Sequence, residues 1–458
     1  MSYSPSVTSD SYIYEPKDRA PDGHSYRTNW QSEAADYELG GIIRIPISQV
    51  ERGFVNVENS WLNLSISDVT IAGTGIVADA IKMSYIGGSA CFDQVNLISG
   101  GSYISHQTQY QSIYALNFLN NTDVNNSLTN SITNNSTKPE SGGSGTLFDA
   151  MEGNSLPMTL TGTTAAVQTG TLTMSIPLMG ILNGEKAIPL GLLTQESVIE
   201  LYLTNDIKNI FFNAAANGTI TGLGSATFTA NFDAMIEVVS PNAFREIKAA
   251  SAGNNNITTW SSTEQRASSN TILQVELNSD SLMEKQMLVT GVKPRKLLSI
   301  VSGCFRDNSQ GNYDKWSVVQ PWDKTNSGLQ WAVGTMLYPP RRIANDSEIL
   351  KHVQACYNQE NYTTQSNRYA QTAFSNRIHS GSNAALPKTN VVRSSCGLDF
   401  TSFDKEADGV DVSAVNILVS GNLKRGLVDA DSNYQFISVK RFGVLYSISE
   451  SGDWSVSY

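Results

Sequence analysis

The sequence predicts an all-β protein with two domains. Only 16% of the 458 residues are charged, and glycine, serine, threonine and asparagine are abundant, a composition typical of short strands joined by many turns. Several segments alternate apolar and polar residues, which is the pattern of a half-buried strand. Because hydrophobic cores stop growing at about 250–300 residues, a chain of this length is expected to divide into two domains.

The first 40 residues are polar and contain five tyrosines and three prolines without any regular spacing. This composition indicates an extended N-terminal arm or a disordered tail. The segment is not rich in arginine, although arms that condense a genome need positive charge. It also contains no apolar run of the kind that a signal peptide requires, so we expect a protein that is not secreted.

Strands are predicted from Gly41 onward. In the stretch WLNLSISDVTI, Leu62, Leu64 and Ile66 alternate with polar residues, as in a strand with one buried face. The apolar spacing then changes to that of a helix over about Ser105–Leu119. Further strands are expected up to about residue 239, where the first domain closes near residue 248.

Two polar stretches interrupt this pattern. Residues 120–145 are almost free of large apolar side chains, and their length predicts a surface insertion that extends to about residue 170. Residues 249–270 have the composition of a linker between the domains.

The triplet Ile-Pro-Leu occurs twice, at Ile176–Leu178 and at Ile188–Leu190. Proline cannot donate a hydrogen bond to a neighbouring strand, so it is expected where a strand ends. We therefore predict that Pro177 ends one strand and that Pro189 stiffens the connection to the next strand, with a turn at Asn183-Gly184 between them.

The second half, residues 271–458, repeats this order of strands, one helix, a polar stretch and more strands. Its clearest feature is a helix that Asn345 can cap, with Glu348 three residues later. Apolar residues follow on one helical face: Ile349, Val353, Cys356 and Tyr357.

The net charge of −11 argues against binding to nucleic acid or to anionic lipid, because such binding gains its free energy from basic residues that displace counterions. We expect no direct contact between this chain and a genome, and we interpret the acidic balance as a means of keeping the surface soluble.

The residues suggest no catalytic, cofactor or metal site, and we expect no enzymatic activity. The histidines lack the spacing of metal ligands and are His24, His106, His352 and His379. The cysteines are far apart and contain no C-x-x-C pair, so we expect buried free thiols in a reducing compartment; they are Cys91, Cys304, Cys356 and Cys396.

One acidic segment, Asp404–Gly409, has carboxylates at positions 1, 3 and 5 and glycine at position 6 of a calcium-loop pattern. Position 12 is Val415, where such a loop needs a bidentate glutamate. We therefore favour a solvated acidic turn over a cation site.

Five segments, taken in order, resemble parts of double jelly-roll major capsid proteins, most closely those of polinton-like viruses and virophages. Each segment alone is a weak signal, and their common order carries the resemblance. The segments are RIPISQVERGFVNVENSWLNLSI, GGSYISHQTQYQSIYALNFL, IPLMGILNGEKAIPLGLLTQESVIELYL, YPPRRIANDSEILKHVQACYN and ADGVDVSAVNILVSGNL.

The resemblance implies two eight-stranded antiparallel jelly rolls in tandem, residues 41–248 and 271–458, with short helices and long surface loops. It also implies a homotrimer that forms pseudo-hexagonal capsomers of an icosahedral virion shell, with penton and minor capsid proteins as further partners. The insertion would belong to an outer tower, and the N-terminal arm would lie under the shell, against neighbouring subunits or an internal membrane.

Two other classes of function stay open at this point. A receptor- or glycan-binding β-sandwich would carry a compact cluster of aromatic and acidic residues. An enzyme on a jelly-roll scaffold, such as a glycoside hydrolase, would need a pair of carboxylates at hydrolytic spacing in a cleft.

Overall fold

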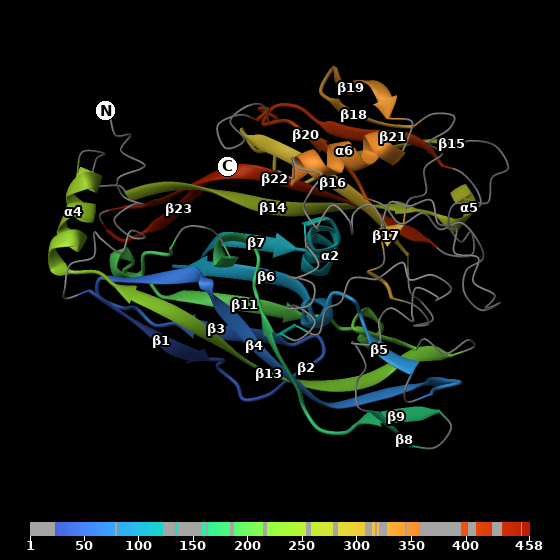
Figure 1. Ribbon diagram of the computed structural model, residues 1–458, viewed down its shortest axis with the longest axis horizontal. Helices are drawn as coiled ribbons and strands as arrows, with labels where there is room; N and C mark the ends of the chain where they lie inside the picture. Colours follow the sequence, from blue (N-terminus) through green and yellow to red (C-terminus); the bar gives the residue numbers. More distant parts are fainter. Residues whose placement is uncertain are drawn as a thin grey trace.

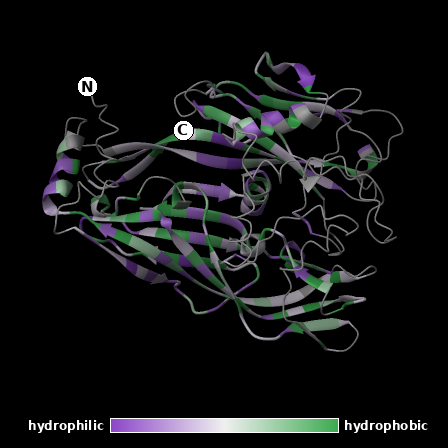
Figure 2. Ribbon diagram, in the orientation of Figure 1, coloured by the Kyte–Doolittle hydropathy of each residue, from purple (hydrophilic) through white to green (hydrophobic). Residues whose placement is uncertain are grey.

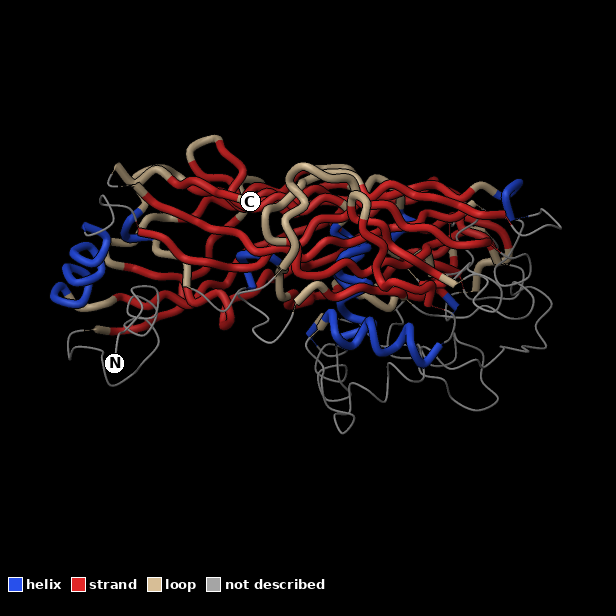
Figure 3. Tube along the Cα trace, turned by 90° about the horizontal axis from the view of Figure 1, so that it is seen from above, coloured by secondary structure: helices blue, strands red, loops and turns tan. Residues whose placement is uncertain are grey.

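The strands of the protein form two sandwiches that lie one above the other (Figure 1). The computed structural model describes residues 23–77, 80–121, 133–134, 158–161, 164–183, 187–213, 218–252, 258–277, 283–306, 314–316, 318–319, 328–343, 346–357, 395–401, 409–423, 433–449 and 451–458. Seen from above, most strands of both sandwiches run along the long axis of the molecule (Figure 3). The prediction of an all-β chain with two sandwiches in tandem is confirmed.

The first sandwich consists of a seven-stranded sheet, a four-stranded sheet and a short two-stranded pair. The seven-stranded sheet follows the order β1-β13-β4-β9-β8, with β10 also paired to β4 and β2 to β13. Its strands are β1 (His24–Gln31), β2 (Tyr37–Glu38), β4 (Gly53–Thr74), β8 (Met158–Leu160), β9 (Ala165–Gln168), β10 (Leu172–Ile176) and β13 (Thr219–Val238). The four-stranded sheet, in the order β3-β11-β6-β7, and the pair β12-β5 contain β3 (Ile42–Ile47), β5 (Ile81–Met83), β6 (Phe92–Ser99), β7 (Ser102–Thr108), β11 (Ser197–Leu203) and β12 (Phe211–Asn213).

The core of this sandwich follows from the alternation in its two longest strands. Leu62 and Leu64 of β4 are fully buried, and Phe232 of β13 lies directly opposite Leu62 in the antiparallel register. Figure 2 shows hydrophobic and hydrophilic residues alternating along these strands. The buried face of the sheet is therefore the face that the sequence pattern predicts.

The second sandwich pairs a six-stranded sheet with a four-stranded sheet. The six-stranded sheet follows β14-β22-β16-β17, with β20 on β16 and β23 on β22; the other sheet is β15-β21-β18-β19. The strands are β14 (Thr258–Ile272), β15 (Met283–Val289), β16 (Leu297–Arg306), β17 (Val318–Val319), β18 (Leu329–Val333), β19 (Met336–Ile343), β20 (Cys396–Asp399), β21 (Ile417–Leu423), β22 (Tyr434–Ile448) and β23 (Trp454–Ser457). The helices of the described part are α2 (Tyr110–Asn121), α4 (Pro241–Ala252), α5 (Gln274–Leu277), α6 (Asp346–Cys356), η3 (Gly87–Cys91), η5 (Gly180–Asn183), η6 (Leu190–Leu192) and η7 (Ile207–Asn209).

Part of the predicted N-terminal arm is a strand instead. All eight residues of β1 pair with β13, although only one of their side chains, that of Trp30, is buried, and its ring stacks on Phe232 at 6.0 Å. An edge strand that buries a single side chain shows no apolar alternation, so the pattern could not reveal it.

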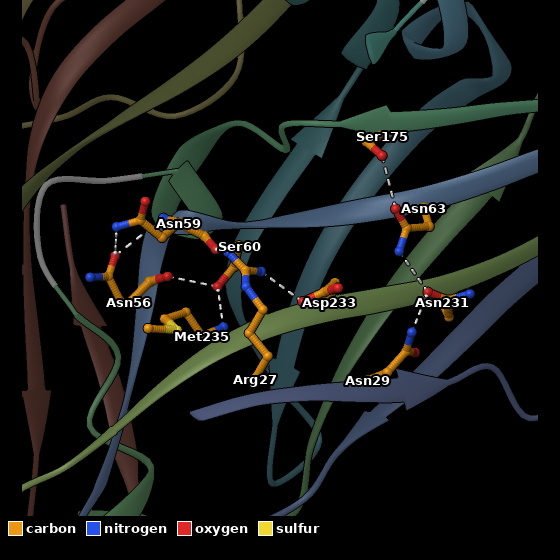
Figure 4. A network of polar contacts seen from close by, with 10 residues as sticks. All are labelled: Arg27, Asn29, Asn56, Asn59, Ser60, Asn63, Ser175, Asn231, Asp233 and Met235. Carbon is orange, nitrogen blue, oxygen red and sulfur yellow. Dashed lines mark hydrogen bonds and ion pairs between the residues drawn. The ribbon is translucent and has the colours of Figure 1, made fainter. Parts of the chain in front are cut away.

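Side-chain hydrogen bonds attach β1 to the sheet in addition to the backbone ladder (Figure 4). The amide of Asn29 donates to Asn231 Oδ1 at 2.9 Å, and the amide of Asn63 donates to the same oxygen at 3.0 Å. Ser175 continues this row by donating to Asn63 Oδ1 at 3.0 Å. Polar residues on β1, β13, β4 and β10 are thus linked across four strands of the outer face.

Two other segments also differ from the predictions. Residues 258–272, within and just beyond the predicted linker, form β14, which pairs with β22 along its whole length. Strands β8 and β9 fall within the predicted insertion at 120–170, most of which lies outside the described residues. The polar composition of β14 has a structural reason, because it faces a polar contact between the two sandwiches rather than an apolar core.

Of the two predicted helices, one begins later than expected and the other is confirmed. The helix predicted over Ser105–Leu119 begins only at Tyr110, because residues 102–108 pair with β6 as strand β7. The helix of the second half is confirmed as α6, whose residues Ile349, Val353 and Cys356 are buried. Its predicted cap, Asn345, lies outside the described residues, as do residues 404–408 of the acidic segment.

Pro177 follows the end of a strand, and Pro189 lies in the connection between two strands, as predicted. Strand β10 ends at Ile176, immediately before Pro177. Pro189 is buried and precedes η6, while its neighbour Ile188 exchanges two backbone hydrogen bonds with Val55, of 2.8 and 3.0 Å. The segment around Pro189 is therefore anchored to β4 before β11 begins.

Replacing Pro189 by glycine is expected to lower the free energy of unfolding by about 1–2 kcal/mol, because the unfolded chain gains freedom and a buried ring loses its contacts. Chemical denaturation of the two proteins measures this difference. Pro340→Gly on β19 is the matched control, since that proline is exposed and its loss changes only the freedom of the chain. Equal losses in the two variants would contradict a packing role for Pro189.

Candidate functional site: the seam between the two sandwiches

A continuous apolar core joins the two sandwiches along a contact that we call the seam. Strands β16 and β22 present buried side chains on both faces of the six-stranded sheet. Ile300 and Phe436 belong to the core of the second sandwich, whereas Val301, Phe305 and Val439 belong to the same apolar cluster as the core of the first. A sheet buried on both faces can separate from neither neighbour without exposing apolar surface.

Helix α2 fills the seam between the sandwiches (Figure 1). Tyr110, Tyr114 and Phe118 are buried, with ring centroids 6.3 and 5.9 Å apart along the helix, and burial raises the pKa of Tyr110 far above its usual value. Asn117 donates to Gln265 Oε1 of β14 at 2.8 Å. A helix with buried side chains on nearly all sides is typical of a protein interior, and α2 lies in the interior between the two sandwiches.

Asp314 makes a second connection between the sandwiches. It is 3% exposed and accepts hydrogen bonds from Ser84 Oγ at 2.9 Å and from the backbone N–H of Tyr85 at 2.8 Å. The indole N–H of Trp316 donates to the carbonyl of Asn209 at 2.9 Å. A short segment of the second half is thereby fixed to the first sandwich.

Polar residues form a row across the four-stranded sheet, and His106 at one end of the row lies near Arg266 of the second sandwich. Arg44, Glu200, Asn96 and His106 lie opposite one another on β3, β11, β6 and β7. The Arg44 guanidinium donates to Glu200 Oε1 at 2.5 and 2.8 Å, and His106 Nδ1 lies 2.8 Å from Asn96 Oδ1. Burial, together with the positive charge of Arg266 on β14, lowers the pKa of His106 below its ordinary 6.5.

Arg266 belongs to a buried polar cluster on the other side of the seam. Its guanidinium lies 3.4 Å from Glu264 Oε2, and the two residues are 5% and 0% exposed. The hydroxyl of Tyr446 donates to Glu264 Oε1 at 2.8 Å, and Arg266 donates to the hydroxyl of Tyr458 at 3.4 Å. Burial and the Glu264 carboxylate raise the pKa of Tyr446 well above its usual value. The carboxylate is therefore satisfied by a cation and a hydroxyl.

The described histidines lie apart from one another, whereas Cys396 lies near both Cys304 and Cys356 in the second sandwich. His24 lies on β1, His106 on β7 and His352 on α6, while His379 lies outside the described residues. The four cysteines are buried free thiols, as predicted. Within the described ranges, no cluster of three or more His, Cys, Asp and Glu residues is arranged to hold a metal ion.

The sequence did not point to Glu264, Arg266, His106 or Asp314. His106 and Arg266 are 160 residues apart, and β14 was interpreted as a linker because its residues are polar. A signal was present, since Glu264, Arg266 and Ser268 alternate with period two, but an alternation of polar with small residues does not distinguish a strand from a loop.

Comparison with solved structures identifies the architecture. A chain of the Sputnik virophage superposes with a TM-score of 0.59 at 13% identity, covering 96% of this chain and 89% of that chain. The mavirus major capsid protein gives 0.57 at 12% identity, with 94% and 90% covered, and the PBCV-1 virus capsid gives 0.58 at 9% identity, with 96% and 98% covered. The chain has the double jelly-roll fold. The resemblance drawn from the sequence is thereby confirmed for the fold.

No family model matches the sequence, and no curated protein is similar to it in sequence. The double jelly-roll fold is therefore assigned from the comparison of three-dimensional structures, which covers 94–96% of this chain. In the described part, no helix is long and apolar enough to cross a membrane.

The buried pair of this double jelly roll can be tested by substitution. Arg266→Met leaves Glu264 buried without its cation, which is expected to lower the free energy of unfolding by about 3–5 kcal/mol. Arg266→Met combined with Glu264→Gln removes both charges and keeps the contact with Tyr446, so most of that loss is expected to be recovered. Chemical denaturation of both variants gives the comparison. If the double variant is no more stable than the single variant, the pair is not the source of the loss.

His106 is expected to make the seam weaker in acid. Its pKa is lowered in the folded chain, so the unfolded chain binds the proton more readily and stability falls as the pH drops below about 6.5. Between about pH 7.5 and 5, the melting temperature of His106→Gln should therefore fall less than that of the unchanged protein. His24→Gln, at the exposed end of β1, serves as the control and should retain the full pH dependence. A His106→Gln variant that loses as much as the control would refute this role.

Proposed function

We propose that this chain is a viral major capsid protein that self-assembles as homotrimeric, pseudo-hexagonal capsomers of an icosahedral shell. The observation that carries the proposal is the match of both sandwiches and their mutual arrangement to viral capsid chains, over 94–96% of this chain for the three comparisons above. Such a role makes the virion its location. A capsid protein acts through its contact surfaces and its rigidity, so this role needs no reactive residue.

The seam supports this role because it makes one rigid body of the two sandwiches. A capsomer of three chains presents six sandwiches at near-regular angles only if the angle within each chain is fixed. Apolar packing by α2, the Asp314 contacts and the hydrogen bond from Asn117 to Gln265 all act on that angle. Close-packed interiors have low compressibility and transmit strain, so this packing and these hydrogen bonds together restrict the angle between the sandwiches.

Surfaces for assembly are also present. Met336 and Leu337 are 60% and 52% exposed on β19, and Val275 of α5 is 72% exposed. Strand β19 is one of the two edge strands of its sheet within the described residues, and exposed apolar residues at an edge favour contact with another chain. Permanent oligomers bury about 2,000–5,000 Å² per interface, so these residues would be part of a larger contact with neighbouring copies.

The net charge of −11 fits a shell component whose contact with a genome is made by other proteins. In this proposal, penton and minor capsid proteins complete the shell. The N-terminal residues contact neighbours under the shell or a membrane beneath it. The proposal includes neither a cofactor nor direct binding to nucleic acid.

The oligomeric state tests the proposal directly. The purified full-length chain is expected to form a particle of three times 49.7 kDa in mass photometry, and electron microscopy is expected to show pseudo-hexagonal capsomers or their arrays. A protein that stays monomeric at micromolar concentration, and forms no array or shell, would contradict assembly into capsomers.

A further inference from the structure

A pocket of about 530 Å³ opens between the two sandwiches, at one end of the seam. Asp93, Gln94 and Asn205 line it from the first sandwich, and Gln435 and Ile437 line it from β22 of the second. Its volume falls within the range of about 300–1,000 Å³ that is typical of ligand pockets. The pocket exists only because the two sandwiches are docked.

Side-chain amides dominate the polar lining. Gln94, Gln109, Gln111, Asn205 and Gln435 all contribute. The amide nitrogens of Gln94, Gln109 and Gln111 already donate to protein oxygens, so these three offer mainly acceptors. An exposed amide such as that of Asn205 or Gln435 can offer both a donor and an acceptor. A hydroxyl group has the same dual character, so a surface of amides suits a ligand with several hydroxyl groups. Asp93 adds a carboxylate, which can accept from two adjacent hydroxyls, although one of its oxygens already accepts from the Gln111 amide at 2.5 Å.

Gln109 is held in a conformation that points to a functional constraint. Its backbone lies in the left-handed region at φ 56°, which non-glycine residues occupy mainly where the surroundings impose it. Its amide nitrogen donates to Ser269 Oγ of β14 at 2.9 Å, while its buried Oε1 has no hydrogen-bond partner among the described residues. The residue thus links the sandwiches beside the pocket and retains an unused acceptor.

Two aromatic rings complete the lining. Trp316 is 5% exposed and is fixed by its hydrogen bond to Asn209 and by Lys315 Nζ, 5.1 Å from its ring centroid. Tyr202 is half-buried and donates to Glu200 Oε2 at 3.3 Å. Rigid rings with a polar tip provide apolar surface beside hydrogen-bonding groups, as needed by a ring-shaped ligand with C–H faces and hydroxyl edges.

The lining disfavours other ligand classes. None of the described lining residues is lysine or arginine, so a phosphate or another anion would face Asp93 without a cation to balance it. A wholly apolar ligand would cover amides without satisfying their hydrogen bonds, which costs free energy. We propose that this seam pocket binds a neutral saccharide. The proposal is independent of capsid assembly, because it concerns a surface within one chain.

The test is saturation-transfer-difference NMR on the intact full-length protein. The probes are methyl glycosides of galactose, glucose, fucose and N-acetylglucosamine, with sialic acid as the anionic comparison. At least one neutral glycoside is expected to bind with a Kd of about 1–10 mM. If no neutral glycoside binds up to about 10 mM, or if only sialic acid binds, the proposal is overturned.

Variants locate the binding. Asn205→Leu and Gln435→Leu remove one amide from each sandwich at exposed positions, so both variants are expected to fold. Each is expected to weaken binding by about 2–10-fold, the effect of one lost hydrogen bond. Gln31→Leu, an exposed amide on β1 away from the pocket, should bind as the unchanged protein does.

Binding that neither pocket variant weakens would place the saccharide elsewhere and overturn the proposal. Thermal unfolding of each variant confirms that it is folded. The oligomeric mass of the same samples separates the two proposals, since a monomer that binds saccharide at this pocket contradicts the capsomer and leaves the pocket intact.

Discussion

The whole molecule depends on one sheet that is buried on both faces. In strands β16 and β22 of this sheet, alternate residues enter two different cores, one within the second sandwich and one shared with the first. Such strands need apolar residues at nearly every position. Lys440 on β22 is an exception that supports the rule: it is 1% exposed, its amine donates to the carbonyls of Thr290 and Val292 at 2.7 and 2.5 Å, and burial lowers its pKa to about 8.

The polar part of the seam adds specificity to this packing. The row from Arg44 through Glu200 and Asn96 to His106 exists only in one register of four strands. A slip of one residue would place Glu200 in the apolar core. Apolar contacts tolerate small sliding, whereas a buried carboxylate does not, because its desolvation is offset only when its partners are in place. We therefore interpret the polar row as fixing the register of its own sheet. The hydrogen bonds that cross the seam, from Asn117 to Gln265 and from Ser84 to Asp314, fix how the sandwiches dock.

The sequence predicted those elements in which one face is apolar and the other polar. Strands β4 and β13 and helix α6 are of this kind, and all three were found. Strands β1 and β14 were missed because most of their side chains meet solvent or a polar seam, so neither strand has a continuous apolar face. The site was missed for a related reason. The proximity of His106 to Arg266 is a product of docking, and no local pattern encodes contact between two domains.

The seam also explains why amides dominate the polar lining of the pocket. Twisted sheets that pack face to face diverge toward their ends, so the seam must open somewhere. Charged residues at that opening would be partly desolvated without fixed partners, and apolar residues would extend the exposed patch. Exposed amides such as Asn205 and Gln435 avoid both costs, since water can satisfy them when the pocket is empty. Amide groups that hydrogen-bond to water can also hydrogen-bond to hydroxyl groups. The side chains that are stable at a solvent-exposed opening are therefore also suited to the proposed saccharide. The exposed apolar residues on β19 form a separate surface, so the proposed subunit contacts and the proposed ligand site place no conflicting demands on the same residues.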